Sequence, residues 1–335
     1  MGDPGGIGAE VIVQALDDPR IRGRARFVIY GFSALLVQEA ERRGIEPRWF
    51  RIPHESARAR KPLFDPVVVL DFSEFGEIES FPHEPSRAGG LASKAYVEEA
   101  ITDALRPADD PRFIDALVTA PISKESWQMA GYRWPGHTEL LENRSRAKRS
   151  AMMFWSPRLR VVLATTHLAL MEIRNQLTIG RVFDPIDLGH EACRKMGIEH
   201  PRIAVTGLNP HAGEKGLFGD EEIRIIQPAI DLARRGGIDA RGPFPADTIF
   251  IAAAAGEYDL VVAMYHDQGL IPVKLLGWDS AVNWTIGIPF VRTSPDHGTA
   301  FDIAGRAKAS AGSMIAAIEL ALRVTENRGA ERPPL

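Results

Sequence analysis

The stretch Leu260-Val-Val-Ala-Met264 is followed directly by Tyr265-His266-Asp267-Gln268-Gly269. An uninterrupted apolar run of this length predicts a strand that is buried on both faces of a parallel sheet. The residues just past such a strand lie at its carboxyl end, where open α/β sheets bind ligands. A histidine followed by an aspartate fills a core poorly and suits a binding site. We therefore expect this stretch to mark a functional site.

The same arrangement occurs twice more along the chain. Val161-Val-Leu-Ala164 leads into Thr165-Thr-His167, and Ile203-Ala-Val205 leads into Gly207-Leu-Asn-Pro-His211. Three neutral imidazoles are a good ligand set for a divalent metal that keeps an open position. Because the three histidines follow separate strands, no diagnostic short spacing supports the metal, and histidines with a structural role remain the alternative.

The remainder of the chain alternates between strand and helix patterns. We expect strands at residues 26–31, 66–71, 115–121 and 281–285, and helices at 32–43, 92–105, 225–235 and 311–323. Gly89-Gly90 should break the chain before the second helix, and residues 291–305 read as a polar loop. Such alternation predicts a doubly wound α/β fold with a largely parallel sheet.

Composition excludes several classes of protein. With 335 residues, 45% hydrophobic residues and a net charge of −4, the chain is expected to be a globular protein that binds no nucleic acid. The single cysteine, Cys193, excludes an internal disulfide and suits a reducing, cytoplasmic environment. No apolar run of about 18 residues predicts a membrane span, and no signal peptide is visible.

Charged residues near the strand ends suggest an anionic substrate. Lys274 and Arg292 lie close to Asn283 in sequence and suit a phosphate or carboxylate. Asp247 and Asp267 are candidates for acid, base or ligand-orienting roles. A metal beside such groups fits either hydrolysis of a phosphorylated compound or oxidation of an alcohol by a nicotinamide cofactor. The residues by themselves leave both chemistries open.

The loop His297-Gly-Thr-Ala-Phe-Asp-Ile-Ala-Gly305 resembles the cofactor loop of the isocitrate and isopropylmalate dehydrogenases, which holds the adenosine half of the cofactor. From Gly2 to about Ala321 the chain resembles the 4-hydroxythreonine-4-phosphate dehydrogenases of pyridoxine biosynthesis, the PdxA family. The motifs that carry this resemblance are Gly-Asp-Pro-Gly-Gly-Ile-Gly8, Thr-Ala-Pro-Ile-Ser-Lys124, Pro-Gly-His137-Thr-Glu, Thr-Thr-His167, Gly-Leu-Asn-Pro-His211-Ala-Gly-Glu, Pro-Ala-Asp247-Thr, Tyr-His266-Asp-Gln-Gly and Arg292-Thr-Ser-Pro-Asp-His-Gly-Thr-Ala.

This resemblance implies a two-domain, doubly wound α/β/α fold like that of isocitrate and isopropylmalate dehydrogenase, with the active site in the interdomain cleft. The first domain would comprise residues 1–125 and 292–335. The second, 126–291, would carry the metal site and the interface of a homodimer whose two chains share the active site.

The resemblance also assigns roles to individual residues. The metal ligands would be His167, His211 and His266, one of them supplied by the partner subunit. The substrate would contact His137, Thr138, Lys274, Asn283 and Arg292. Catalytic roles would fall to Asp247, Asp267 and Lys124. The cofactor would contact His297, Gly298, Thr299 and Asp302, and an aspartate at 302 favours NAD over NADP.

The implied reaction is oxidation and decarboxylation of 4-phosphooxy-L-threonine to 3-amino-2-oxopropyl phosphate, dependent on NAD and a divalent metal. Three imidazoles favour zinc, with cobalt and magnesium as alternatives. A paralogous D-threonate or D-erythronate 4-phosphate dehydrogenase would share the metal and phosphate residues. An aromatic dihydrodiol dehydrogenase, a metal-dependent phosphatase and a non-catalytic NAD-binding protein are further alternatives.

Two departures from the family pattern lead to expectations of their own. The family usually has an apolar strand before Gly-Asp-Pro, whereas Met1 stands where that strand should end. We expect either a start further upstream or a sheet that lacks this strand and is less stable. Trp284 is unusually bulky for its position and is expected to narrow the substrate pocket.

Overall fold

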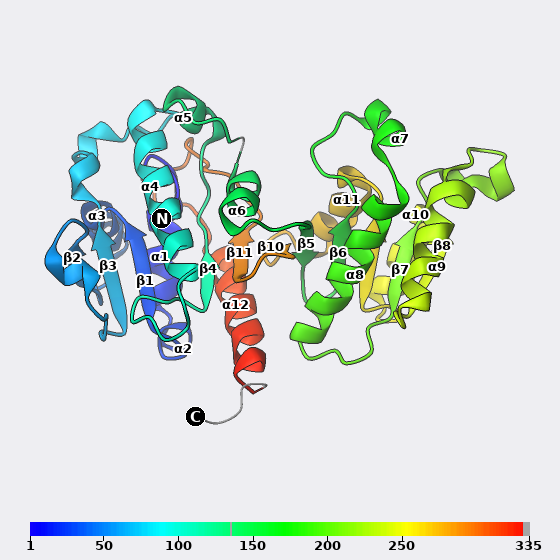
Figure 1. Ribbon diagram of the computed structural model, residues 1–335. Coiled ribbons are helices and arrows are strands. Elements are labelled where there is room, and N and C mark those ends of the chain that lie inside the picture. The colour runs from blue at the N-terminus through cyan, green and yellow to red at the C-terminus, as the bar shows by residue number, and fades with distance from the viewer. Residues whose placement is uncertain (135, 331–335) are drawn as a thin grey trace. The chain divides into compact units, whose positions relative to one another are not determined.

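A computed structural model of the chain describes residues 1–134 and 136–330 (Figure 1). Pro135, in the Pro-Gly-His137 motif, and residues 331–335 lie outside them. The described chain divides into two compact units: unit 1 is Met1–Arg146 with Pro289–Thr325, and unit 2 is Ala147–Ile288 with residues 326–330. Residues 126–146, which the sequence assigned to the second domain, lie in unit 1.

Unit 1 is built on short parallel strands. β1 (Phe27–Gly31), β3 (Val67–Asp71) and β2 (Phe50–Pro53) pair in this order, and all three are parallel. β4 (Ala116–Val118) pairs in parallel with β11 (Val291–Pro295). The helices are α1 (Gly8–Asp17), α2 (Pro19–Arg22), α3 (Ser33–Arg43), α4 (Arg87–Ala104), α5 (Lys124–Met129), α6 (His137–Ser145) and α12 (Gly312–Ala330), the last of which runs on past Thr325.

Some local expectations for unit 1 were wrong. Helix α4 runs through Gly89 and Gly90, where a break was expected. An added Cβ would lie 2.6 Å from Asp3 Oδ1 at Gly89 and 2.0 Å from the Ser126 carbonyl oxygen at Gly90. These glycines therefore let the Asp3 side chain and the Ser126 backbone approach the helix, and they do not end it. The first five residues of the expected polar loop at 291–305 form β11, and all five are buried.

Unit 2 contains a mixed sheet with the order β10-β5-β6-β9-β7-β8. The four strands β6, β9, β7 and β8 are parallel, whereas β5 is antiparallel to both of its neighbours. The strands are β5 (Ala151–Trp155), β6 (Arg160–Leu163), β7 (Ile203–Thr206), β8 (Ala240–Phe244), β9 (Leu260–Ala263) and β10 (Val282–Ile286). The helices are α7 (Ile173–Gln176), α8 (Ile179–Lys195), α9 (Gln227–Arg235), α10 (Ala246–Ala254) and α11 (His266–Gly277).

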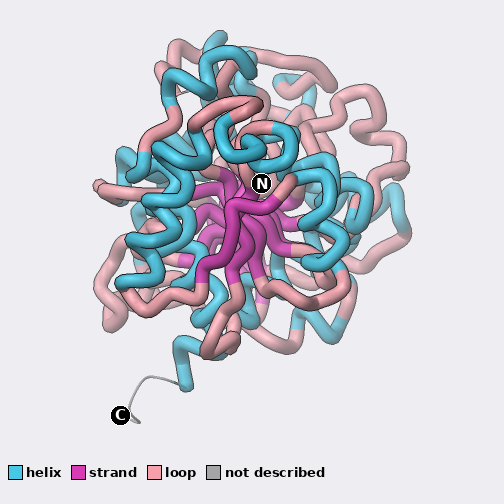
Figure 2. Tube along the Cα trace, turned by 90° about the vertical axis from the view of Figure 1, so that its right-hand side faces the viewer, coloured by secondary structure: helices cyan, strands magenta, loops and turns pink. Residues whose placement is uncertain are grey.

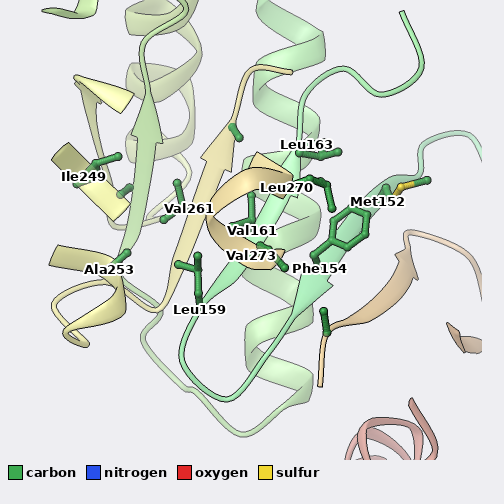
Figure 3. Packing of buried hydrophobic residues seen from close by; sticks show 13 residues of the cluster. Met152, Phe154, Leu159, Val161, Leu163, Ile249, Ala253, Val261, Leu270 and Val273 are labelled. Carbon is green, nitrogen blue, oxygen red and sulfur yellow. The ribbon is translucent and has the colours of Figure 1, made fainter. Parts of the chain in front are cut away.

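Helices cover both faces of this sheet, as a doubly wound fold requires. On one face, Gly189 of α8 lies so close to Leu260 and Val162 that a Cβ would come within 2.4 Å of Leu260 Cδ2. On the other face, Gly269 of α11 meets Leu163 and Val161 in the same way. Helices α10 and α11 bury the second face around Val161, Val261, Ile249 and Leu270 (Figure 3). The mixed α/β fold with parallel strands predicted from the sequence is therefore confirmed.

Helices and loops surround the strands (Figure 2). Among the helices within residues 1–134 and 136–330, we find none with the length and apolar character needed to cross a membrane.

Candidate functional site

The three histidine segments of unit 2 follow three strands that are neighbours in the sheet. His167 comes after β6, His211 after β7, and His266 opens α11 after β9. Strand β9 lies between β6 and β7 and is parallel to both. The carboxyl ends of the three strands therefore share one edge of the sheet, and the histidine segments leave from that edge.

Two of the three imidazoles lie side by side. The ring centroids of His167 and His266 are 5.9 Å apart. Asp267 Oδ1 is 2.7 Å from His266 Nδ1, an arrangement in which a carboxylate fixes the orientation of an imidazole and leaves Nε2 available. His211 instead has its ring 6.1 Å from that of Phe218. Among the residues that the structure describes, no three acidic, histidine or cysteine side chains are grouped as metal ligands.

A buried polar frame ties these strand ends together. The Thr165 hydroxyl donates to the Met264 carbonyl at 2.7 Å, which links the ends of β6 and β9. Gln268 Oε1 accepts from the Met264 amide at 2.6 Å and from the Thr206 hydroxyl at 2.7 Å. Gln268 Nε2 donates to the Gly207 carbonyl at 2.8 Å. The frame connects the backbone ahead of His167, His211 and His266, and the sequence interpretation did not anticipate this role for Gln268.

The other candidate residues of unit 2 are more dispersed. Asp247 is exposed in the first turn of α10. Lys274 lies two turns after His266 on α11, roughly 12 Å along the helix axis at 1.5 Å per residue, and its Nζ is 5.8 Å from the Trp278 ring centroid.

Asn283 lies on β10, and its Oδ1 is buried without a hydrogen-bond partner in the described chain. Trp284, which was expected to narrow the substrate pocket, follows Asn283 on β10. Successive side chains of a strand point to opposite faces, so the Trp284 side chain, 3% exposed, is buried on the face away from Asn283.

In unit 1, a buried cation and a neutral imidazole come together. Arg292 on β11 is 3% exposed, and its guanidinium donates to Thr119 Oγ1 at 2.7 Å. Burial lowers the pKa of Arg292 to about 10, so this side chain remains charged at neutral pH. Burial and the nearby positive charge of Arg292 hold the pKa of His137 well below its usual value, which leaves this imidazole neutral.

Other polar candidates of unit 1 stand at the starts of helices α5 and α6. Ser123 caps α5 by accepting from the Ser126 amide at 3.0 Å, and Lys124 is the first residue of that helix. Gly136 precedes His137 and Thr138 at the start of α6, and a Cβ there would lie 3.5 Å from Lys124 Cε. His137 Nε2 is buried without a hydrogen-bond partner among the described residues. Thr119, the hydrogen-bond partner of Arg292, is a candidate site residue that the sequence interpretation missed. Its place directly after β4, at the carboxyl end of a parallel strand, could have indicated it.

The expected cofactor loop packs against the glycine-rich N-terminal loop. The Ile7 amide donates to the Thr299 carbonyl at 3.0 Å, and a Cβ on Gly6 would lie 2.8 Å from the same oxygen. His83 Nδ1 lies 2.8 Å from the Gly5 carbonyl oxygen, and its Nε2 would be 2.7 Å from a Cβ on Gly305. The glycines therefore serve contacts between protein segments. Asp302 is exposed, while His297 and Thr299 are half-buried and Gly298 is exposed.

The chain is similar over nearly its whole length to known dehydrogenases. It is 45% identical to the 4-hydroxythreonine-4-phosphate dehydrogenase of Geobacter metallireducens, over 98% of this chain and 95% of that protein. It is 43% identical to the D-threonate 4-phosphate dehydrogenase of Salmonella typhimurium, over 97% of each. The crystal structure of the Klebsiella pneumoniae 4-hydroxythreonine-4-phosphate dehydrogenase matches with a TM-score of 0.82 at 40% identity, covering 97% of this chain and 96% of that one.

Fold, site and relatives together define an oxidoreductase with a mixed α/β architecture. Residues 24–321 match the model of the pyridoxal phosphate biosynthetic protein PdxA. The chain belongs to the PdxA family, as the motifs in its sequence predicted.

Proposed function

We propose that this protein oxidises and decarboxylates 4-phosphooxy-L-threonine, with NAD as the electron acceptor and a divalent metal as cofactor. Hydride passes from C3 of the substrate to NAD, and the C3 hydroxyl gives up its proton to a base. The bond between C1 and C2 then breaks, carbon dioxide leaves, and C2 is protonated to give 3-amino-2-oxopropyl phosphate. Proton transfer falls to Asp247, Asp267 or Lys124, the polar residues that the family motifs single out.

The pairing of His167 with His266 is the observation that carries this proposal. Two imidazoles on one tetrahedral zinc ion have ring centroids about 5.2 Å apart, because the Zn–N bond is about 2.1 Å, the ring centre lies about 1.1 Å behind the nitrogen and the N–Zn–N angle is about 109°. The observed 5.9 Å is within about 1 Å of this separation, so a small shift of the two side chains would bring both rings onto one metal ion. Asp267 holds the Nδ1 side of His266, the usual second contact of a metal-binding histidine. A divalent metal bound there would polarise the substrate oxygen and stabilise negative charge that develops during decarboxylation.

The proposed contacts of the anionic substrate are charged or polar side chains. A buried guanidinium such as that of Arg292 suits phosphate through paired donors. Neutral His137 can donate or accept a hydrogen bond without adding charge. We include Thr138, Lys274 and Asn283 among the substrate contacts.

We place NAD on His297, Gly298, Thr299 and Asp302. The exposed carboxylate of Asp302 suits a free ribose 2′-hydroxyl and repels a 2′-phosphate, which favours NAD over NADP.

We also propose that the third histidine reaches the metal in a homodimer. Large apolar side chains are exposed just beyond each histidine: Met171 (83%) after His167, Leu217 (73%) after His211, and Leu275 (81%) on α11 after His266. Exposed apolar side chains of this kind favour surfaces that a partner covers. A second copy of the chain on these surfaces would approach all three histidine segments, and in this proposal His211 of one chain completes the pair in the other. Cytoplasmic localisation is proposed as well, since the only cysteine, Cys193, is free and buried.

An absorbance assay for NADH tests the function. Purified protein is supplied with zinc, cobalt or magnesium, and with 4-phosphooxy-L-threonine, D-threonate 4-phosphate, D-erythronate 4-phosphate or an aromatic cis-dihydrodiol. We expect the highest kcat/KM with 4-phosphooxy-L-threonine. The D-threonate 4-phosphate enzyme is the second candidate, because a relative that acts on this compound is 43% identical.

Turnover of the sugar-acid phosphates without turnover of 4-phosphooxy-L-threonine would refute the leading proposal in favour of that candidate. Release of inorganic phosphate without NADH would indicate a phosphatase. Full activity after removal of the metal by a chelator would show that the metal assignment is wrong.

A further inference from the structure

The segment that carries His211 has an unfavourable backbone. Five consecutive residues, 211–215, are left-handed, with φ between 42° and 78°. Only Gly213 among them adopts this conformation at low cost, because a Cβ crowds the following carbonyl in the other four. All five except Ala212 and Gly213 are exposed, so the packing of their own side chains does not hold the turn. A contact from elsewhere must stabilise it.

The Glu222 carboxylate supplies such a contact. Glu222 is 3% exposed and lies in a π-helical turn, Glu222–Ile226, just ahead of α9. Its Oε1 accepts from the amides of Leu208 and Asn209, both at 2.7 Å. Its Oε2 accepts from Asn209 Nδ2 at 3.0 Å. Charge-assisted hydrogen bonds of this kind are stronger than neutral ones, so three of them fix the backbone that leads into His211.

Two glycines show how closely this carboxylate and the turn fit. A Cβ on Gly213 would lie 2.6 Å from Glu222 Oε2, and a Cβ on Gly207 would lie 3.0 Å from Glu222 Oε1. Glu222 therefore touches the segment on both sides of His211.

The neighbouring Glu221 extends the contact to the segment that follows His167. Its Oε2 accepts from Asn209 Nδ2 at 2.8 Å, and its Oε1 pairs with Arg174 of α7 at 2.7 Å. Asn209 is thus shared by two buried carboxylates, and one of them is anchored to the chain just after His167.

We propose that Glu222 is the residue that positions His211 for metal binding, by holding residues 207–213 in the conformation that presents its imidazole. The metal role of His211 rests on the proposed function, whereas the hydrogen bonds by which Glu222 holds the turn do not depend on it. Partners behind a metal ligand typically change metal affinity about 10- to 100-fold when they are removed.

The experiment compares Glu222→Ala and Glu222→Gln with a matched control, Asp259→Ala. Asp259 also accepts from a backbone amide, that of Arg202 at 2.9 Å, but it precedes β9 at the opposite end of the strand from His266. Two readouts are taken on the metal-free, full-length chain. One is hydrogen–deuterium exchange of a peptide that covers residues 208–218. The other is zinc affinity, measured by competition with a chromophoric chelator.

In Glu222→Ala we expect exchange in residues 208–218 to be at least about tenfold faster, and zinc affinity to fall about 10- to 100-fold. Glu222→Gln keeps one acceptor oxygen, so its exchange rate and its zinc affinity should both be close to those of the wild type. If Glu222→Ala acted only by unfolding the chain, no such difference between the two variants would be expected. Unchanged exchange in β9 confirms that the variants are folded. Asp259→Ala should alter neither readout.

If residues 208–218 of Glu222→Ala exchange at the wild-type rate, the proposal that Glu222 holds the turn is refuted. If Glu222→Ala exchanges faster but binds zinc as tightly as the wild type, the positioning role is refuted. The same holds if Asp259→Ala loses as much zinc affinity as Glu222→Ala does. If the wild-type chain binds no zinc at all, the metal assignment in the proposed function fails, while the exchange data still decide whether Glu222 holds the turn.

Discussion

Replacing Gln268 by leucine should weaken unit 2 considerably, because this side chain makes three buried hydrogen bonds between strand ends. It accepts from the Met264 amide and the Thr206 hydroxyl, and it donates to the Gly207 carbonyl. Leucine has nearly the same volume but no polar atoms. A buried group left without its partner costs about 1–3 kcal/mol. The Thr206 hydroxyl can rotate towards another acceptor, so two backbone groups bear most of the loss, and the free energy of unfolding should fall by about 2–6 kcal/mol.

Urea unfolding followed by circular dichroism measures this loss. Gln227→Leu is the matched control, since Gln227 is half-buried on α9 and donates to Asp231 at 2.9 Å. The free energy of unfolding of this control should change by no more than about 0.5 kcal/mol, as for most surface substitutions. A loss below about 1 kcal/mol in Gln268→Leu would refute the reasoning, because it would mean that the strand ends keep their spacing without this frame.

Two further changes test the dimer and the site of unit 1. Leu275→Asp should convert a dimer into an inactive monomer with an unchanged circular dichroism spectrum, since Leu275 is exposed. Phe64→Asp, at a site of unit 1 that is also exposed, should stay dimeric. Sedimentation equilibrium measures the oligomeric state of both variants, and a dimeric Leu275→Asp variant would contradict the proposed interface. His137→Gln should reduce the pH dependence of stability. The folded state holds the pKa of His137 below its unfolded value of 6.5, so the unfolded chain binds the extra proton and the wild type loses stability as pH falls below 6.5. Between pH 7.5 and 5.5 the wild type should lose up to about 1.4 kcal/mol more than the variant in urea unfolding, and equal losses would show that His137 is not kept neutral.

Much of the α/β architecture was predictable because its signals are local. The run from Leu260 to Met264 is apolar throughout, and the structure places β9 within it, between two parallel neighbours. The end of such a strand is a ligand-binding position for reasons of sheet geometry, so His266 could be singled out without any knowledge of its neighbours. The family motifs then gave the class of enzyme, which the relatives confirm.

The local rules failed where a distant segment decided the outcome. Gly89 and Gly90 are poor helix residues, yet α4 continues through them, and the close approach of Asp3 and Ser126 explains why these positions carry no side chain. β11 contains arginine, threonine, serine and proline, yet it is buried because it pairs with β4. The register of β10 places the Trp284 side chain on the face away from Asn283, which the sequence alone did not reveal.

By itself the sequence determined the apolar strands such as β6, β7 and β9, the residues at their carboxyl ends and the family of the chain, because apolar runs and motifs are properties of neighbouring residues. Only the tertiary structure decided that His167 and His266 are paired while His211 stands beside Phe218. It also decided that Gln268 and Glu222 both form hydrogen bonds with the segment that leads from β7 to His211. The physical reason is that strand order and helix packing set the distances between residues far apart in the chain, and these distances leave no periodic trace in the sequence.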